Sequence, residues 1–256
     1  MFVPGYTGSK EDFLAILTPV SRAGHRAVAI DLRGQFETPG SEEEAAYGLD
    51  ELAADVLALI EVLGGWAHLV GHSFGGFVTG AAATASVATD PAATVVRSLA
   101  LIGSGPSAVT GEGTRMSLAL LTAALPEHDM ETIWAAKRAL EHQRGDPEVP
   151  AEIEDFLHAR FVRNHPLGLS VAAAQLLAPD DRTAALAALS TPLLVLYGER
   201  EDVWAPSELA AMAARIGAGA QLLPGAGHSP AVDDPDATAA ALVELWSRAE
   251  AATHPG

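Results

Sequence analysis

The chain has 256 residues, 49% of them hydrophobic and 19% charged, a composition typical of a globular protein long enough to bury a sizeable core. It carries 33 acidic and 15 basic residues, a formal net charge of −18, which argues against nucleic acids and anionic membranes as partners. It has no cysteine, which excludes disulfides and thiolate nucleophiles, and no apolar run reaches the roughly 18–20 residues that a membrane helix needs.

Apolar runs and periodic patterns predict alternating strands and helices along the first part of the chain. In chain order we expect a short strand that enters a Gly-rich loop over 2–8, a helix over 10–24 and a strand over 25–34. A polar loop over 35–48 and a second helix over 49–65 come next. In the second helix, Leu52, Val56, Leu59 and Leu63 are predicted to share one apolar face. A strand, a helix and another strand follow over 66–73, 74–88 and 93–105.

The same alternation resumes near the C-terminus, with strands at 191–199 and 220–228 and helices at 207–217 and 235–252. It predicts an α/β fold, a mostly parallel sheet with helices on both faces. The region between interrupts this rhythm with a run of helices at 114–125, 130–143, 151–165, 167–178 and 180–189. We therefore expect a core of residues 1–103 and 191–256 and a helical insertion of residues 104–190, lying over the carboxyl ends of the strands.

The segment Gly71-His72-Ser73-Phe74-Gly75 stands where a strand is predicted to pass into a helix. It matches the nucleophile elbow, a strained turn that exposes a serine hydroxyl, and it also fits a Gly-rich connection without chemistry. The apolar strand before it and the small-residue helix after it favour the elbow. A phosphate-binding turn is disfavoured because neither G-x-G-x-x-G nor G-x-x-x-x-G-K-[ST] occurs in the chain.

A serine nucleophile needs a base, and nine histidines compete for that role. His228 is the strongest candidate, because its Gly-rich loop follows the last strand and reaches the same sheet edge as Ser73. His72 is interpreted as a packing residue. The histidines of the insertion are interpreted as solvated or partly buried helix residues, with no third ligand spaced to complete a metal site: His128, His142, His158 and His165.

The base needs a carboxylate to orient it, and Glu199, Glu201 and Asp202 follow the strand at 191–199. Asp31 also lies at a strand end, but it precedes Ser73, whereas this arrangement usually runs serine, acid, histidine. For Asp31 we predict a structural role, anchoring Arg33 or backbone amides.

Five segments together, VPGYTG, DLRGQFETPG, GHSFGG, YGEREDVWAP and GAGHSP, resemble the α/β-hydrolase fold family in its helical-cap branch. The resemblance covers essentially the whole chain. It implies Ser73 as nucleophile, His228 as general base, and an oxyanion hole made by the backbone N–H groups of Tyr6 and Phe74. It implies a small-molecule acyl substrate and no cofactor.

Three positions depart from the family pattern. Pro4-Gly5 replaces the usual His-Gly before the oxyanion residue, and the acid position falls on Glu201, with Asp202 next to it; either could serve, and the register favours Glu201. Only Met1–Val3 precede the oxyanion loop, where the family normally has two or more strands. We therefore expect a sheet without the antiparallel edge hairpin, and a recorded start that is internal to the gene product.

The leading functional hypothesis is a serine hydrolase that cleaves a carboxylic ester, lactone or thioester through an acyl-enzyme on Ser73. Cofactor-free peroxidation, C–C bond hydrolysis and aminopeptidase activity use the same groups and stay open, as does a non-catalytic ligand-binding or truncated member. Met116, Trp134 and Phe156 in the insertion are consistent with an apolar acyl pocket and equally with ordinary packing. We expect a cytoplasmic protein; the oligomeric state and the acyl and leaving groups stay open.

Overall fold

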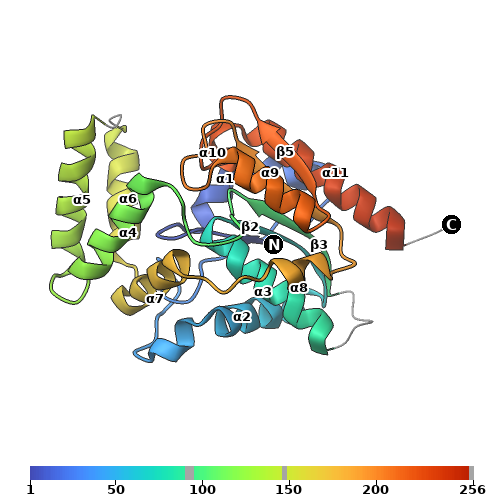
Figure 1. Cartoon of the computed structure of the whole chain (residues 1–256), viewed down its shortest axis with the longest axis horizontal. Coiled ribbons are helices and arrows are strands. Elements are labelled where there is room, and N and C mark those ends of the chain that lie inside the picture. The colour runs from blue at the N-terminus through green and yellow to red at the C-terminus, as the bar shows by residue number, and fades with distance from the viewer. Residues whose placement is uncertain (90–94, 146–148, 254–256) are drawn as a thin grey trace.

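A computed structural model describes residues 1–89, 95–145 and 149–253 and contains one five-stranded sheet (Figure 1). Neighbouring strands pair in parallel throughout. Their spatial order follows the chain: β1 (Phe2–Val3), β2 (Ala67–His72), β3 (Val96–Ile102), β4 (Leu193–Gly198) and β5 (Gly219–Leu223). The predicted mostly parallel sheet with flanking helices is confirmed. Of the strand predicted at 93–105, residues 93–94 lie outside the described residues.

Helices connect the strands and follow the predicted order. In the first half these are the 3₁₀ helices η1 (Lys10–Phe13) and η2 (Glu44–Tyr47), and α1 (Leu14–Arg22), α2 (Leu49–Leu63) and α3 (Phe74–Thr89). Between β3 and β4 lie α4 (Glu112–Ala124), α5 (Met130–Arg144), α6 (Ala151–Val162), α7 (Pro166–Leu177) and α8 (Thr183–Ala187). The last are α9 (Pro206–Arg215), α10 (Pro230–Asp233) and α11 (Pro235–Thr253).

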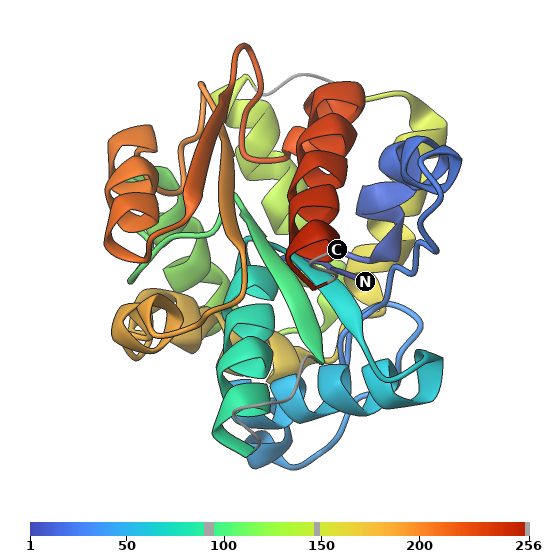
Figure 2. The same ribbon diagram turned by 90° about the vertical axis from the view of Figure 1, so that its right-hand side faces the viewer.

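The sheet separates two hydrophobic cores, because side chains alternate between its faces along each strand. Leu99 and Leu101 of β3 belong to the core that α2, α3 and α9 cover, whereas Ala100 and Ile102 belong to the core under α1 and α11. Figure 2 shows α1 and α11 on one side of the strands and α3 and α9 on the other. With both faces covered, access to the sheet is left at its edges and ends.

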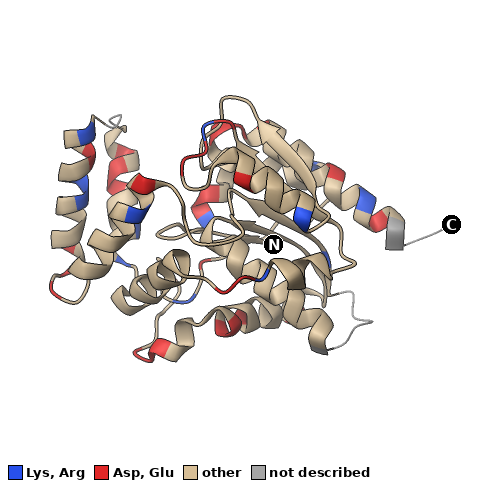
Figure 3. Cartoon of the chain, in the orientation of Figure 1, with Lys and Arg blue, Asp and Glu red and all other residues tan. Residues whose placement is uncertain are grey.

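Helix α3 carries no charged side chain, which its burial against the sheet explains (Figure 3). The helix predicted at 49–65 is confirmed as α2, but the prediction of its apolar face was partly wrong. Leu52 and Val56 are buried as expected, while Leu59 is exposed and Ile60 takes its place in the core. The buried stripe also contains Leu49 and Ala53, which shifts its centre toward Ile60 and leaves Leu59 at its opposite flank.

The strand predicted at 25–34 reduces to a single bridge between Ala29 and Phe2. Phe2 N–H donates to Val28 O at 2.8 Å, and Ile30 N–H donates to Phe2 O at 3.1 Å. Because β1 is only two residues long, it offers this segment one residue with which to pair, and no ladder extends beyond it.

Helices α4, α5 and α6 stand to one side of the sheet, and α7 lies between them and the core (Figure 1). Helix α8 packs instead against α3 and α9. An ion pair ties this group back to the start of the chain, since Arg160 of α6 binds Asp12. Within the described part of the chain, no helix combines the length and apolar character needed to cross a membrane.

Candidate active site

Ser73 occupies the turn between β2 and α3 with a left-handed backbone, φ 51°. A non-glycine residue there is strained, and such strain clusters at functional sites. The flanking glycines are required by close approach: a β-carbon on Gly71 would lie 2.4 Å from Gly75 O, and one on Gly75 would lie 2.3 Å from Val3 O. Ser73 N–H donates to Ile102 O at 2.9 Å, which fixes the turn to the end of β3.

His228 lies in the loop between β5 and α10, and its imidazole is held by Glu201. The distance from His228 Nδ1 to Glu201 Oε1 is 2.7 Å. The Glu201 side chain is fully buried, and Oε1 also accepts a hydrogen bond from Val203 N–H at 3.0 Å. Because a carboxylate only accepts, Nδ1 carries the hydrogen, and the Nε2 lone pair of the neutral ring is left available for a proton.

The other acidic candidates do not reach this imidazole. Asp202 is exposed to solvent, whereas Glu201 points into the protein. Glu199 Oε2 accepts a hydrogen bond from Gly225 N–H at 2.9 Å and so orders the loop before His228. The structure therefore brings Glu201, and not Asp202, against His228.

His72, the residue before Ser73, binds the backbone of the candidate base His228. Its Nε2 lies 2.8 Å from His228 O, and the two rings are 4.9 Å apart between centroids. Since a carbonyl accepts only, Nε2 of His72 must carry the hydrogen. Burial, and next the neighbouring His228, lower the pKa of His72 to about 4, so this ring is neutral at neutral pH. The prediction of a simple packing role missed this bond, because it joins residues 156 positions apart.

The loop after β1 passes directly beside Ser73. A β-carbon on Gly5 would lie 3.0 Å from Ser73 Cβ, so Tyr6 begins next to the nucleophile candidate. Gly5 O accepts hydrogen bonds from Gln35 Nε2 at 2.9 Å and from Gly8 N–H at 3.1 Å. The peptide is planar, so anchoring Gly5 O also fixes the direction of the Tyr6 N–H on its opposite side.

Gln35 is a site residue that the sequence analysis missed. Its side chain is buried, and besides binding Gly5 it accepts a hydrogen bond from Leu32 N–H at 3.0 Å. One amide thus bridges the loop at 31–40 and the loop after β1. Phe74, the other predicted oxyanion residue, is the first residue of α3, where backbone N–H groups have no intrahelical partner.

A cavity of about 460 Å³ opens beside this loop, between α4 and α5. Tyr6 and Thr7 line one end, and apolar residues such as Leu121 and Ile133 line its walls. Burial raises the pKa of the Tyr6 hydroxyl, which has no hydrogen-bond partner among the residues that the structure describes. Met116, Trp134 and Phe156 do not line this cavity: Met116 is exposed, Trp134 packs on Phe161, and Phe156 packs on Phe36.

The remaining polar candidates have structural partners. Asp31 accepts hydrogen bonds from the backbone and side chain of Lys10, both at 2.7 Å, while Arg33 binds Asp55. The predicted structural role of Asp31 is confirmed: of the two partners considered, it binds a backbone amide and not Arg33. In the insertion, His158 pairs with Glu131 at 2.6 Å, and His165 stacks on Tyr47.

Comparison with known proteins agrees with this architecture. Residues 1–241 match the family described as the alpha/beta hydrolase family. A putative carbamate hydrolase, RutD, from Variovorax paradoxus (strain S110) is 31% identical over 199 residues, which are 75% of this chain and 69% of that protein.

Solved structures show the same fold at lower identity. A thermophilic esterase from Thermogutta terrifontis superposes with a TM-score of 0.74 at 24% identity, over 97% of this chain and 89% of the other. An enol-lactonase from Burkholderia xenovorans LB400 gives a TM-score of 0.73 at 19% identity, over 96% and 90% of the two chains.

Proposed function

Because the chain belongs to the alpha/beta hydrolase family, we propose that it is a serine hydrolase that cleaves a carboxylic ester, lactone or thioester through an acyl-enzyme on Ser73. The observation that carries this proposal is the strained Ser73 at the β2–α3 turn, whose neighbour His72 binds His228 O at 2.8 Å, together with a His228 Nδ1 held by the buried Glu201 at 2.7 Å. A turn without chemistry gives no reason to strain a serine backbone or to bury a carboxylate against an imidazole.

In the proposed reaction, Ser73 Oγ attacks the substrate carbonyl carbon while His228 Nε2 accepts the hydroxyl proton. Glu201 stabilises the imidazolium that forms and keeps the ring oriented. The tetrahedral intermediate collapses, the protonated His228 returns the proton to the leaving group, and the acyl group stays on Ser73. Water, deprotonated by the same imidazole, then attacks the acyl-enzyme and releases the carboxylic acid.

The backbone N–H groups of Tyr6 and Phe74 are the proposed oxyanion hole. This assignment is supported by the braced Gly5–Tyr6 peptide and by the position of Phe74 at the start of α3, where the helix dipole favours negative charge. Each such donor is worth about 2.7–4 kcal/mol in the transition state. Neither donor is a side chain, so the Pro4-Gly5 departure leaves both in place.

For the acyl group we propose the cavity between α4 and α5, with the inserted helices acting as a cap over the core. Its volume of about 460 Å³ and its largely apolar walls suit a hydrocarbon chain or an aryl group. Tyr6 supports this link, because its side chain lines the cavity while its backbone belongs to the loop beside Ser73.

A carbamate is a second candidate substrate, favoured by the 31% identity to the putative carbamate hydrolase. The same attack and proton transfers apply to a carbamate carbonyl. A carbamate ester loses its alcohol or phenol in the first step, and water then releases a carbamic acid that decomposes to an amine and CO₂. The amine and CO₂ distinguish it from a carboxylic ester. Peroxidation, C–C cleavage and aminopeptidase chemistry remain alternatives on the same groups.

The test is hydrolysis of p-nitrophenyl esters graded by acyl length, together with lactones, thioesters and aryl carbamates. We expect turnover of at least one ester series and a loss on the order of 10⁴-fold or more in kcat for Ser73→Ala. The matched control is Ser104→Ala, which removes a buried serine hydroxyl at the end of the neighbouring strand. Equal activity of Ser73→Ala and the wild type would reject the proposal, whichever substrate is turned over.

A further inference from the structure

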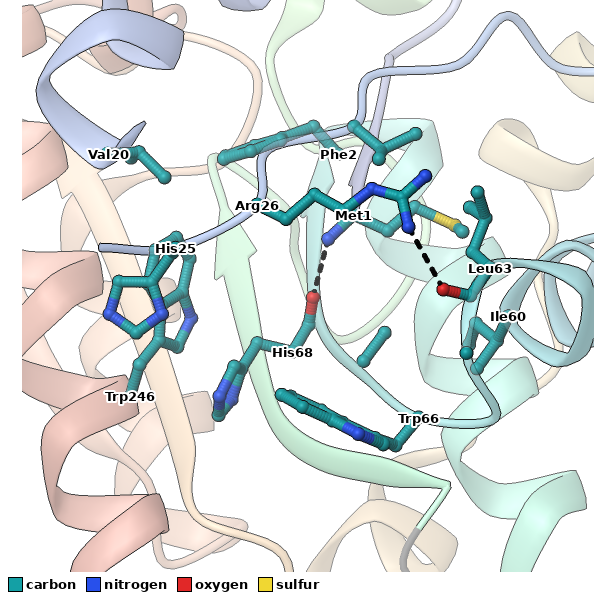
Figure 4. A pocket seen from close by; sticks show the side chains of 13 residues that line it. Met1, Phe2, Val20, His25, Arg26, Ile60, Leu63, Trp66, His68 and Trp246 are labelled. Atoms are coloured by element: carbon teal, nitrogen blue, oxygen red, sulfur yellow. Dashed lines mark hydrogen bonds between the residues drawn. The ribbon is translucent and has the colours of Figure 1, made fainter. Parts of the chain in front are cut away.

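A second cluster of chemically competent side chains lies at the opposite end of β2 from Ser73. His25 follows α1, His68 is the second residue of β2, and Glu250 lies on α11. Among the described residues, these three form the one group of histidine, aspartate and glutamate side chains spaced to hold a metal ion. Figure 4 shows His25 and His68 beside Trp246, at the wall of a pocket of about 180 Å³.

The donor atoms lie slightly wider apart than the ligands of a bound zinc ion. Glu250 Oε1 lies 3.5 Å from His68 Nε2 and 3.9 Å from His25 Nδ1, and all three donors lie within 4.8 Å of one another. The point equidistant from three atoms so placed is about 2.4 Å or less from each. Zinc bonds to imidazole nitrogen and carboxylate oxygen are about 2.0–2.2 Å, so shifts of a few tenths of an ångström bring all three into range.

Neighbouring groups hold the two imidazoles in this arrangement. His68 Nδ1 lies 2.8 Å from the buried Ser98 Oγ, the kind of second contact that orients a ligating histidine. Trp246 stacks on His68 at 5.5 Å and meets His25 edge-on at 4.8 Å. Glu250 stands one helical turn after Trp246, so α11 presents both to the same place.

Glu250 Oε1 faces two imidazole nitrogens at once, whereas the carboxylates of the His158–Glu131 and His165–Glu42 pairs in the described chain each face one. Two imidazole nitrogens beside one carboxylate oxygen are a donor set that a divalent transition metal can bind.

We propose that His25 Nδ1, His68 Nε2 and Glu250 form a binding site for a divalent transition metal, with Zn²⁺ the ion that fits best. Two imidazole nitrogens and one carboxylate oxygen suit zinc and its neighbours, whereas Ca²⁺ and Mg²⁺ prefer oxygen ligands throughout. Three protein ligands leave a fourth position for water or another ligand. The bound ion clamps the end of α11 to β2 and to the segment after α1, far from Ser73.

The experiment is calorimetric titration of ZnCl₂ into untagged, chelator-treated protein, with MgCl₂ as a second titrant. We expect one Zn²⁺ per chain with micromolar or tighter affinity, no comparable Mg²⁺ binding, and a higher midpoint of thermal unfolding when zinc is present. His25→Asn and Glu250→Gln should each weaken zinc binding by at least about tenfold. The matched control is His158→Asn, which removes a histidine from the two-residue pair with Glu131.

Thermal unfolding of the metal-free variants checks that each is folded. Because Glu250 is more exposed than His25, Glu250→Gln should destabilise the fold less than His25→Asn. Zinc affinity that is unchanged in both His25→Asn and Glu250→Gln, or lost only in His158→Asn, would overturn the proposal. Ser73→Ala must keep the wild-type affinity, so the outcome is independent of the proposed hydrolase activity.

Discussion

At the scale of single residues, the candidate site depends on hydrogen bonds that cross large sequence separations. Glu201 holds His228, His72 holds the backbone of His228, and Gln35 holds the backbone of Gly5. Each bond fixes an orientation that catalysis requires and that the local sequence alone does not impose. The role of each residue can therefore be tested by changing one atom or one side chain.

The two adjacent acids give the first prediction. Glu201→Gln keeps the size of the side chain but removes the charge that stabilises an imidazolium, so we expect kcat to fall on the order of 10³–10⁴-fold, by analogy with other triads. Asp202→Asn is the control and should change kcat little, because Asp202 is exposed. Steady-state kinetics on the best ester measures both. A larger loss of kcat in Asp202→Asn than in Glu201→Gln would show that Asp202, and not Glu201, is the acid.

Gln35 gives the second prediction, for a positioning residue. Gln35→Leu removes the donor that fixes Gly5 O, so the Tyr6 N–H loses its direction, and we expect kcat to fall roughly 10–100-fold while KM changes little. Thr38→Val is the matched control, since it removes a hydrogen bond to Asp31 O from the same loop. Comparable kinetics in the two variants would show that Gln35 only stabilises the loop.

At the scale of elements, the candidate site lies where β2, β4 and β5 end and where α3 begins. Parallel strands bring their carboxyl ends to one edge, and the loops that follow them supply Ser73, Glu201 and His228. Helices α4 and α5 then form the walls of the cavity beside the loop after β1. The core elements thus position the proposed reacting groups, and the inserted helices line the cavity proposed for the acyl group.

The cavity gives the third prediction. Ala136 lines it from α5, so Ala136→Phe should fill part of the volume and shift the preference among p-nitrophenyl esters toward shorter acyl chains. Ala139→Phe, on the same helix but outside the cavity lining, is the control. We expect kcat/KM for the longest accepted chain to fall about tenfold or more in Ala136→Phe alone, from loss of buried acyl contacts. An unchanged chain-length profile would exclude this cavity as the acyl site.

The sequence predicted the elements better than the contacts between them. Hydrophobic periodicity and Gly-rich turns located β2, α3, β4 and the five inserted helices to within a few residues, because those signals are local. The strand predicted at 25–34 was wrong, because a strand pairs only along the length of its partner and β1 has two residues. Gln35, the His72 bond and the cluster around Glu250 have no local signal, since each joins residues that only the tertiary fold brings together.

At the scale of the whole molecule, the candidate active site and the proposed metal site lie at opposite ends of a parallel sheet between two cores. In the candidate active site, the buried, neutral His72 lies close to His228, and this has a consequence for stability. Because burial lowers the folded-state pKa of His72 to about 4, below the ordinary 6.5, the unfolded chain binds more protons than the folded one between these values.

The fourth prediction follows from that difference. The contribution of His72 is fully present above about pH 6.5 and is lost as the pH falls toward 4, at most about 3 kcal/mol for this one group. His72→Gln removes the titration, so its free energy of unfolding should fall less steeply over this range, as measured by urea unfolding at several pH values. The charged and titratable groups that act on His72 are His228, Asp12 and Glu201, and the wild type and the variant both keep these three residues. Parallel curves for the two proteins would contradict the prediction.

The central claim is that the Ser73 hydroxyl is a nucleophile activated by His228. The most direct measurement is intact-protein and peptide mass spectrometry after reaction with a fluorophosphonate, which labels only an activated serine. The account predicts one adduct per chain, located on Ser73, absent in Ser73→Ala and strongly slowed in His228→Ala. A folded wild-type protein that gains no adduct, or gains it on another serine, would contradict the account.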